Sequence, residues 1–251
     1  SKSINEQLAA IEAARAIPDS ENAAFIYNEL LTEHPQIPRR PDFLGEDADR
    51  VTKRLPWIAA DHPKLAKWIK GHQPTIDRLL HASAFDKCRF PIADSTNQLN
   101  LRTGNRLSTM RRWAYLLSIA ANNDIAEGRT DNAIAKYRCV TQLARHLCQQ
   151  PIFLEYIIGT AVEELGLQGL YRMLIETDLT ETQIKVIEQF QPTTRENWAD
   201  ISADIIEIER LLSKRTYHPL ARLQAWWSDI SVKSSLEHIP DNHLWIVSRR
   251  R

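Results

Sequence analysis

Proline is unevenly distributed along this chain of 251 residues, and its distribution limits where long helices can form. Eight of the 12 prolines lie within residues 1–91, whereas residues 92–150 and 152–191 contain none. Because a proline inside a helix removes a hydrogen bond and clashes with the preceding turn, long helices are expected only after this first part. We predict a single domain, residues 1–251, with a loop-rich, short-helix part at 1–91 and a long-helix core at 104–251.

Apolar residues recur at helical spacing in the predicted core. Two stripes with alternating spacings of three and four residues stand on either side of Gly128: Leu107, Met110, Ala114, Leu117 and Ala121 in the first, and Ala133, Tyr137, Val140, Ala144 and Leu147 in the second. This pattern predicts an antiparallel helical hairpin over 105–149 that turns at the glycine. Further helices are expected at 151–175 and 195–214. The fold class is therefore all-α, an irregular helical bundle of about eight to ten helices.

Three glycines interrupt the predicted helix 151–175, at Gly159, Gly166 and Gly169. Each costs about 1 kcal/mol relative to alanine in a helix interior, unless a close contact compensates. We therefore interpret these glycines as a close crossing with a neighbouring helix.

Residues 88–102 depart from the helical pattern. Cys88, Phe90 and Ile92 stand at every second position, and so do Leu99 and Leu101. A period of two is typical of β-strands. We therefore expect a small β-hairpin near 88–102.

The sequence lacks the motifs of several enzyme and metal-binding classes. Its seven glycines do not form a dinucleotide-binding loop, a P-loop or a nucleophile elbow, and its three cysteines form no CxxC pair. Neither HExxH nor HxxxH occurs. No metal and no cofactor are therefore expected. The longest apolar run, residues 152–162, is too short to span a bilayer, so no transmembrane segment is expected.

Basic and acidic residues are equal in number, but one segment is strongly basic. Residues 64–112 contain ten basic and three acidic side chains, whereas residues 1–63 contain seven basic and eleven acidic ones. Arginine makes bidentate contacts with phosphate and carboxylate groups, so a phosphate or an acidic peptide would suit this segment. The alternative is pairing within the chain, with the acidic N-terminal segment. The candidate binding residues are Arg89, Arg102, Arg106, Arg111, Arg112 and Trp113.

Carboxylates share one face of the predicted helix 195–214. Asp200, Asp204 and Glu207 follow one another at spacings of four and three residues. A general-acid site or a divalent-cation site needs carboxylates that point the same way. This acidic face would suit a hydrolase or a small-ligand-binding protein. The alternative interpretation is a solvated face whose charges pair with Arg210 or Lys214.

The segment GRTDNAIAKYRCVTQL, which begins at Gly128, resembles the second half of a tetratricopeptide repeat. Gly128, Ala133, Ile134 and Tyr137 match the glycine, alanine, aliphatic and aromatic positions of that family. The resemblance covers about 34 residues and is lost one period later, at Pro151. It therefore implies a single degenerate repeat, or helical hairpin, rather than an array.

Residues 21–31, 88–92 and 149–164 look like those of a family of uncharacterised bacterial proteins that usually carry an export signal. This resemblance implies an exported, periplasmic location with the leader removed, and it implies no particular activity. Helical-repeat surfaces usually bind other macromolecules. We therefore predict a non-enzymatic protein-interaction or scaffold protein, with another protein as its partner. No nucleic acid is expected, because the chain as a whole is neutral.

Overall fold

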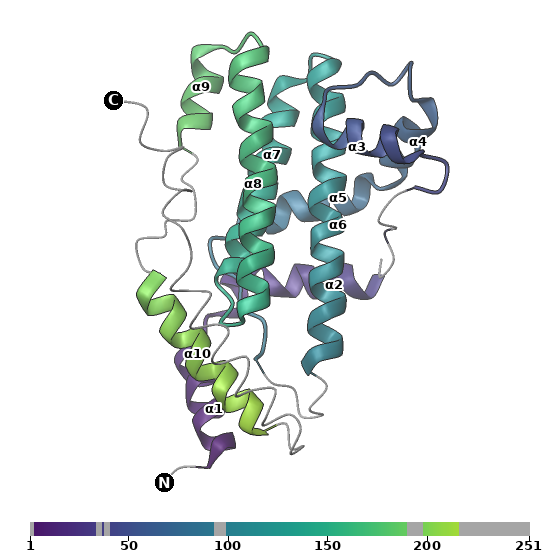
Figure 1. Cartoon of the computed structure of the whole chain (residues 1–251). Coiled ribbons are helices and arrows are strands. Elements are labelled where there is room, and N and C mark those ends of the chain that lie inside the picture. Colours follow the sequence, from purple (N-terminus) through teal and green to yellow (C-terminus); the bar gives the residue numbers. More distant parts are fainter. Residues whose placement is uncertain (1–2, 34–36, 38–40, 93–98, 190–197, 216–251) are drawn as a thin grey trace. The chain divides into compact units, whose positions relative to one another are not determined.

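The structure, a computed structural model, describes residues 3–33, 37, 41–92, 99–189 and 198–215 (Figure 1). This part of the chain contains ten α-helices, a short 3-10 helix at Asp19–Glu21 and no β-strand, so the prediction of an all-α fold is confirmed. None of the helices described combines the length and apolarity that a membrane span requires. The helices are α1 (Ile4–Ala14), α2 (Ala24–Glu33), α3 (Glu46–Arg54), α4 (Pro63–Gly71), α5 (Gln73–Ala82), α6 (Leu99–Ala126), α7 (Thr130–Cys148), α8 (Phe153–Glu176), α9 (Glu181–Glu188) and α10 (Trp198–Arg215).

Contacts divide the chain into two compact units. One comprises residues 1–10 together with 199–251, and the other comprises residues 11–198. Most of α1 and α10 belong to the first unit, whereas α2 to α9 belong to the second. The boundary predicted near residue 91 coincides with neither end of the second unit, and the single domain over 1–251 stays a prediction.

The second unit is built on three long helices, α6, α7 and α8, which pack against one another (Figure 1). Gly128 connects α6 to α7 with a φ of 74°, a conformation that side chains with a Cβ rarely adopt. Only three residues separate the two helices, so they run antiparallel, as the hairpin prediction requires. Their shared core contains the fully buried Trp113, Leu117 and Leu143.

The glycines of α8 lie where that helix crosses α7. A Cβ atom at Gly159 would stand 2.5 Å from Cys148 Sγ, and one at Gly166 would stand 2.8 Å from Thr141 Cγ2. A Cβ at Gly169 would collide with the ring of Tyr137. The absent side chains therefore permit the close approach of the two helices, and the interpretation of these glycines as a crossing point is confirmed.

Helix α3 was not predicted from the sequence. Its residues, EDADRVTKR, are mostly charged and carry no apolar stripe that would indicate a helix. The helix packs on α6, where the side-chain amide of Asn122 donates a hydrogen bond to the carbonyl oxygen of Thr52 at 3.0 Å. Trp57, just after α3, donates from Nε1 to the carbonyl oxygen of Ile119 at 3.0 Å. Tertiary contacts rather than local pattern therefore fix this part of the chain.

The β-hairpin expected near 88–102 is wrong. Residues 86–92, which we call the strap, form no helix and only one isolated bridge, between Lys87 and Asn22, and residues 99–102 already belong to α6. Side-chain amides take the place of a second strand. Gln149 Oε1 accepts from the backbone nitrogen of Cys88 at 2.8 Å, Gln150 Nε2 donates to the carbonyl oxygen of the same residue at 2.8 Å, and Gln150 Oε1 accepts from the Phe90 nitrogen at 3.2 Å. On the other side, Asn22 bonds both backbone groups of Arg89.

Candidate functional site

The strap carries Arg89, the first of the predicted binding residues. Its Nη2 donates to Glu12 Oε2 at 2.5 Å and to the Glu12 carbonyl oxygen at 2.6 Å. The other carboxylate oxygen of Glu12 accepts from the backbone nitrogen of Ile92 at 2.7 Å. Arg89 therefore fastens the strap to the acidic N-terminal segment, which is the alternative that the sequence left open for it.

Arg106 points into the interior rather than to a partner. Its guanidinium pairs with the carboxylate of Glu155 on α8 and lies 4.1 Å from the centre of the Phe90 ring. The side chain of Arg106 is 13% exposed and that of Glu155 is 2% exposed. Burial raises the pKa of Glu155, and the charge and hydrogen bond of Arg106 act against that rise. The pair thus joins α6 to the buried side of α8.

The remaining residues of the predicted arginine surface are dispersed. Arg112 donates from Nη1 to the carbonyl oxygen of Ile37 at 3.0 Å, whereas Arg111 is exposed. Trp113 is fully buried and stacks near Tyr27, with 6.0 Å between the ring centres, so its assignment to a binding surface is wrong. The side chain of Arg102 lies outside the described residues. Of the predicted binding residues whose side chains the structure describes, only Arg111 is exposed, so these residues do not form one exposed surface.

On the acidic face of α10, the carboxylate of Glu207 is already paired with a basic side chain of the same helix. Glu207 forms a bidentate ion pair with Arg210: Arg210 Nε donates to Glu207 Oε2 at 2.8 Å, and Nη2 donates to Oε1 at 2.6 Å. This hydrogen bonding lowers the pKa of Glu207. Asp204 is exposed, and the side chain of Asp200 lies outside the described residues. No group of three or more His, Cys, Asp or Glu side chains within the described ranges is arranged to hold a metal ion.

His146 is the centre of a buried polar cluster that the sequence did not indicate. Its Nε2 lies 2.8 Å from the carbonyl oxygen of Phe85, which can only accept, so the proton belongs on Nε2 and Nδ1 accepts from the Tyr27 hydroxyl at 2.9 Å. Burial lowers the pKa of His146 to about 4. The neutral imidazole therefore joins α7 to α2 and to the residue before the strap.

A second polar cluster lies beside the turn between α6 and α7; its members are buried except for Arg129, whose side chain is 44% exposed. Asp124 accepts from Lys136 Nζ at 2.5 Å and from Arg129 Nε at 2.7 Å. Asn122 accepts from the hydroxyl of Tyr137 at 2.6 Å. These hydrogen bonds and ion pairs join the two helices of the hairpin to each other and to the turn between them.

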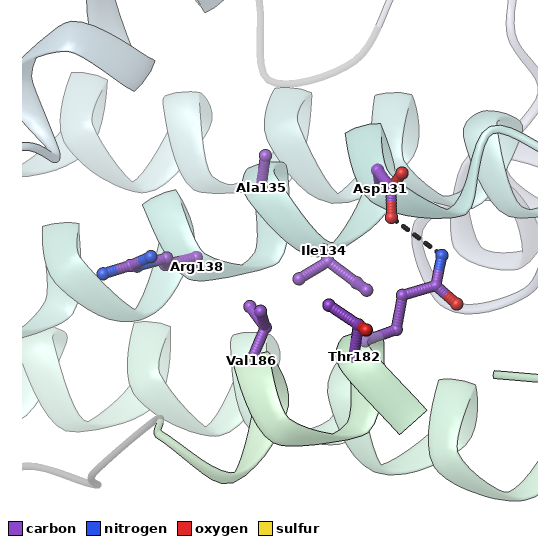
Figure 2. Close-up of a pocket in the computed structure, with 7 residues that line it drawn as sticks. Asp131, Ile134, Ala135, Arg138, Thr182 and Val186 are labelled. Carbon is purple, nitrogen blue, oxygen red and sulfur yellow. Dashed lines mark hydrogen bonds between the residues drawn. The ribbon is translucent and has the colours of Figure 1, made fainter. Parts of the chain in front are cut away.

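A shallow groove lies between α7 and α9 (Figure 2). Ile134 and Val186 form its apolar floor, Arg138 lies at one end, and Asp131 lies at the other, where it accepts a hydrogen bond from Gln183 Nε2 at 2.7 Å. The groove measures about 240 Å³. Typical small-molecule sites measure roughly 300–1,000 Å³ and enclose their ligand, so this groove has the size of a shallow surface contact.

Helix α8 has a second side, opposite the glycines, that the sequence analysis did not separate from the buried one. We call it the outer face of α8; its residues follow one another at alternating spacings of three and four. They are Leu154, Ile157, Ala161, Glu164, Gln168, Tyr171 and Ile175, with Leu174 beside the last two.

The apolar members of the outer face are exposed. Leu154 is 52% exposed, Ile157 44%, Tyr171 57% and Ile175 61%. Soluble helices normally place charged residues on the side away from the core, but the only basic residue in α8 is Arg172. The sequence contained a signal for this face, since apolar residues lie on two opposite sides of the predicted helix. The outer face was not recognised because a stripe of core residues and a stripe of exposed residues have the same spacing.

Comparison of the chain with family models, with curated proteins and with solved structures gives no match. The resemblance of Gly128–Leu143 to a tetratricopeptide repeat therefore stays a prediction.

Proposed function

We propose that this protein is a non-enzymatic interaction protein, a helical scaffold that binds another protein through the outer face of α8. The observation that carries the proposal is the row of exposed apolar side chains from Leu154 to Ile175. Exposed apolar patches on soluble proteins typically mark sites of association. The opposite side of the helix packs against α7 and α6, so the outer face is directed away from these two helices.

The proposal differs from the sequence-based one in its location. The arginine segment was expected to bind the partner, but Arg89 and Arg106 are engaged inside the protein. The alternative, a hydrolase or small-ligand-binding protein acting through α10, has less support because Glu207 is already neutralised by Arg210 on the same helix. An interaction role requires no cofactor, and its partner is another protein.

Site-specific photo-crosslinking in cells tests this proposal. Tyr171 would be replaced by a photo-reactive phenylalanine analogue, and the control would carry the same analogue at Lys185, an exposed position on α9. We expect protein adducts from position 171 and few from position 185. The absence of adducts at 171, with the variant folded by circular dichroism, would contradict the proposal.

A further inference from the structure

The outer face of α8 has a feature that bears on the identity of its partner: from Ile157 to Ile175, its apolar and polar positions follow the same order in either direction. Apolar residues lie at both ends, Leu154 and Ile157 at one and Tyr171 and Ile175 at the other. The polar pair Glu164 and Gln168 lies between them, with Gln168 Nε2 donating to Glu164 Oε1 at 2.9 Å. A surface of this kind is complementary to itself under a two-fold rotation.

We propose that the occupant of the outer face is a second copy of this chain, with the two α8 helices antiparallel and the two-fold axis crossing the outer face at the level of residue 166. The inference rests on the proposed function and names its partner. The same contact is made twice in such an arrangement, so the interface closes and a dimer is its end point.

The register follows from placing apolar residues opposite apolar ones and polar residues opposite polar ones. With the axis near residue 166, Ile157 faces Ile175 of the second copy and Ala161 faces Tyr171, a small residue opposite a large one. Glu164 then faces Gln168 of the second copy, so the amide can donate to the carboxylate across the interface.

Another register, in which one helix slides by one heptad along the other, is less favourable. This slide moves the two-fold axis by half a heptad toward the start of α8, and it would place Ile157 against Gln168 and Ala161 against Glu164 of the second copy. Both contacts bury a polar group against an apolar one, which costs free energy without a compensating hydrogen bond.

Residues beside the stripe extend the contact. Leu165 and Leu167 are half-buried in the single chain, and in this register each lies next to its own counterpart across the axis. Additional apolar side chains at positions flanking the stripe would also be covered, including Leu174, which is 44% exposed.

The area is sufficient for a reversible dimer. A helix of 24 residues is about 36 Å long, and covering one side of it in each copy removes roughly 1,000–1,400 Å² in total from water. Specific interfaces begin at about this size. We therefore expect association in the micromolar range rather than a permanent dimer.

Sedimentation velocity of the full chain over a wide concentration range tests the pairing. We expect the 28.9 kDa monomer to convert to twice that mass as the concentration rises. Ile157→Glu and Tyr171→Glu should each weaken association by at least about tenfold, because a carboxylate would then be buried against apolar groups. The matched control is Ile184→Glu on α9, also an exposed apolar position, which should leave the association unchanged.

Cysteine cross-linking tests the direction of pairing, since the three native cysteines are buried. The double variant Ile157→Cys, Ile175→Cys should form an inter-chain disulfide, whereas each single variant should not. Cross-linking of the single variants with themselves would indicate a parallel pair and overturn the arrangement.

The two proposals fail separately. A monomer at every concentration, combined with photo-adducts between Tyr171 and a different protein, would overturn self-pairing and leave the interaction function standing. A monomer that gives no adducts at Tyr171 would overturn both.

Discussion

The two sides of α8 have similarly apolar residues but opposite surroundings. The inner side, with Gly159, Val162, Gly166 and Leu170, packs against α7 so closely that added Cβ atoms would collide with its residues. The outer face carries side chains just as large and apolar, yet they remain exposed.

The difference shows how stability and association are divided within one helix. Contacts of the inner side are complete within the chain, including the ion pair of Glu155 with Arg106. Those of the outer face are incomplete within the described residues, and in the proposed pairing a second copy of the chain completes them. Substitutions on the inner side should therefore change the free energy of unfolding, and substitutions on the outer face should change association.

The largest effect should come from Arg106→Ala, which would leave the buried carboxylate of Glu155 without its partner. We expect a loss of about 4 kcal/mol in the free energy of unfolding at neutral pH, measured by urea denaturation. The control is Arg111→Ala, at an exposed position on the same helix, which should change stability by less than about 0.5 kcal/mol. Equal effects from the two variants would show that the Arg106–Glu155 pair is not buried as described.

A direct comparison of the two sides uses two leucines one turn apart. Leu170 is 3% exposed and Leu174 is 44% exposed. Leu170→Ala should cost about 3 kcal/mol, because it leaves a cavity against α7, whereas Leu174→Ala should cost less than about 0.5 kcal/mol. Thermal denaturation at a concentration where the protein is monomeric measures both. Similar melting temperatures would contradict the assignment of inner and outer sides.

Lowering the pH should reduce the free energy of unfolding through protonation of His146. Its pKa is lowered to about 4 in the folded protein, whereas an unfolded histidine titrates near 6.5. Between these values the unfolded state binds more protons, so this residue makes stability fall as pH falls. The expected contribution is a loss of about 2 kcal/mol between pH 7 and pH 5.

The variant His146→Gln isolates this contribution, since glutamine can bond to Tyr27 and Phe85 but does not titrate in this range. Its free energy of unfolding should depend less on pH between 7 and 5 than that of the wild type. Parallel curves for the two proteins would show that His146 is not buried as a neutral group.

The smallest effect concerns two tyrosines. Tyr137 is buried against Gly169 and donates to Asn122, whereas Tyr171 lies on the outer face. Tyr137→Phe should cost about 1 kcal/mol for the lost hydrogen bond, and Tyr171→Phe should leave stability unchanged. Chemical denaturation with several replicates can resolve this difference. An unchanged free energy of unfolding for Tyr137→Phe would mean that Asn122 Oδ1 accepts a hydrogen bond from another donor.

Long helices were predictable because their residues repeat over many turns. The hairpin of α6 and α7, the turn at Gly128 and the glycine crossing of α8 all follow from local pattern. The capping box of α9, in which Thr180 and Gln183 bond each other's backbone, is also a short-range feature. The sequence therefore predicted the central bundle well.

Features that depend on distant partners were not predictable in this way. Helix α3 has no apolar stripe and is fixed by α6, and the strap alternates like a strand but pairs with glutamine side chains. Arg106 resembled a surface residue because its partner, Glu155, lies 49 residues away. Charge clusters in a sequence indicate the need for neutralisation, but they do not identify which carboxylate provides it.

The strap also has a consequence for synthesis of the chain. Its backbone groups bond to Gln149 and Gln150, which follow Cys88 and Phe90 by 60 to 62 residues. During translation the strap therefore leaves the ribosome before Gln149 and Gln150, which follow α7 directly, have been added to the chain. Contacts of such long sequence separation form late, after the local hairpin has closed. The nascent chain should accordingly expose the thiol of Cys88 until α7 is complete, and a ribosome stalled before residue 149 would keep that thiol open to alkylation.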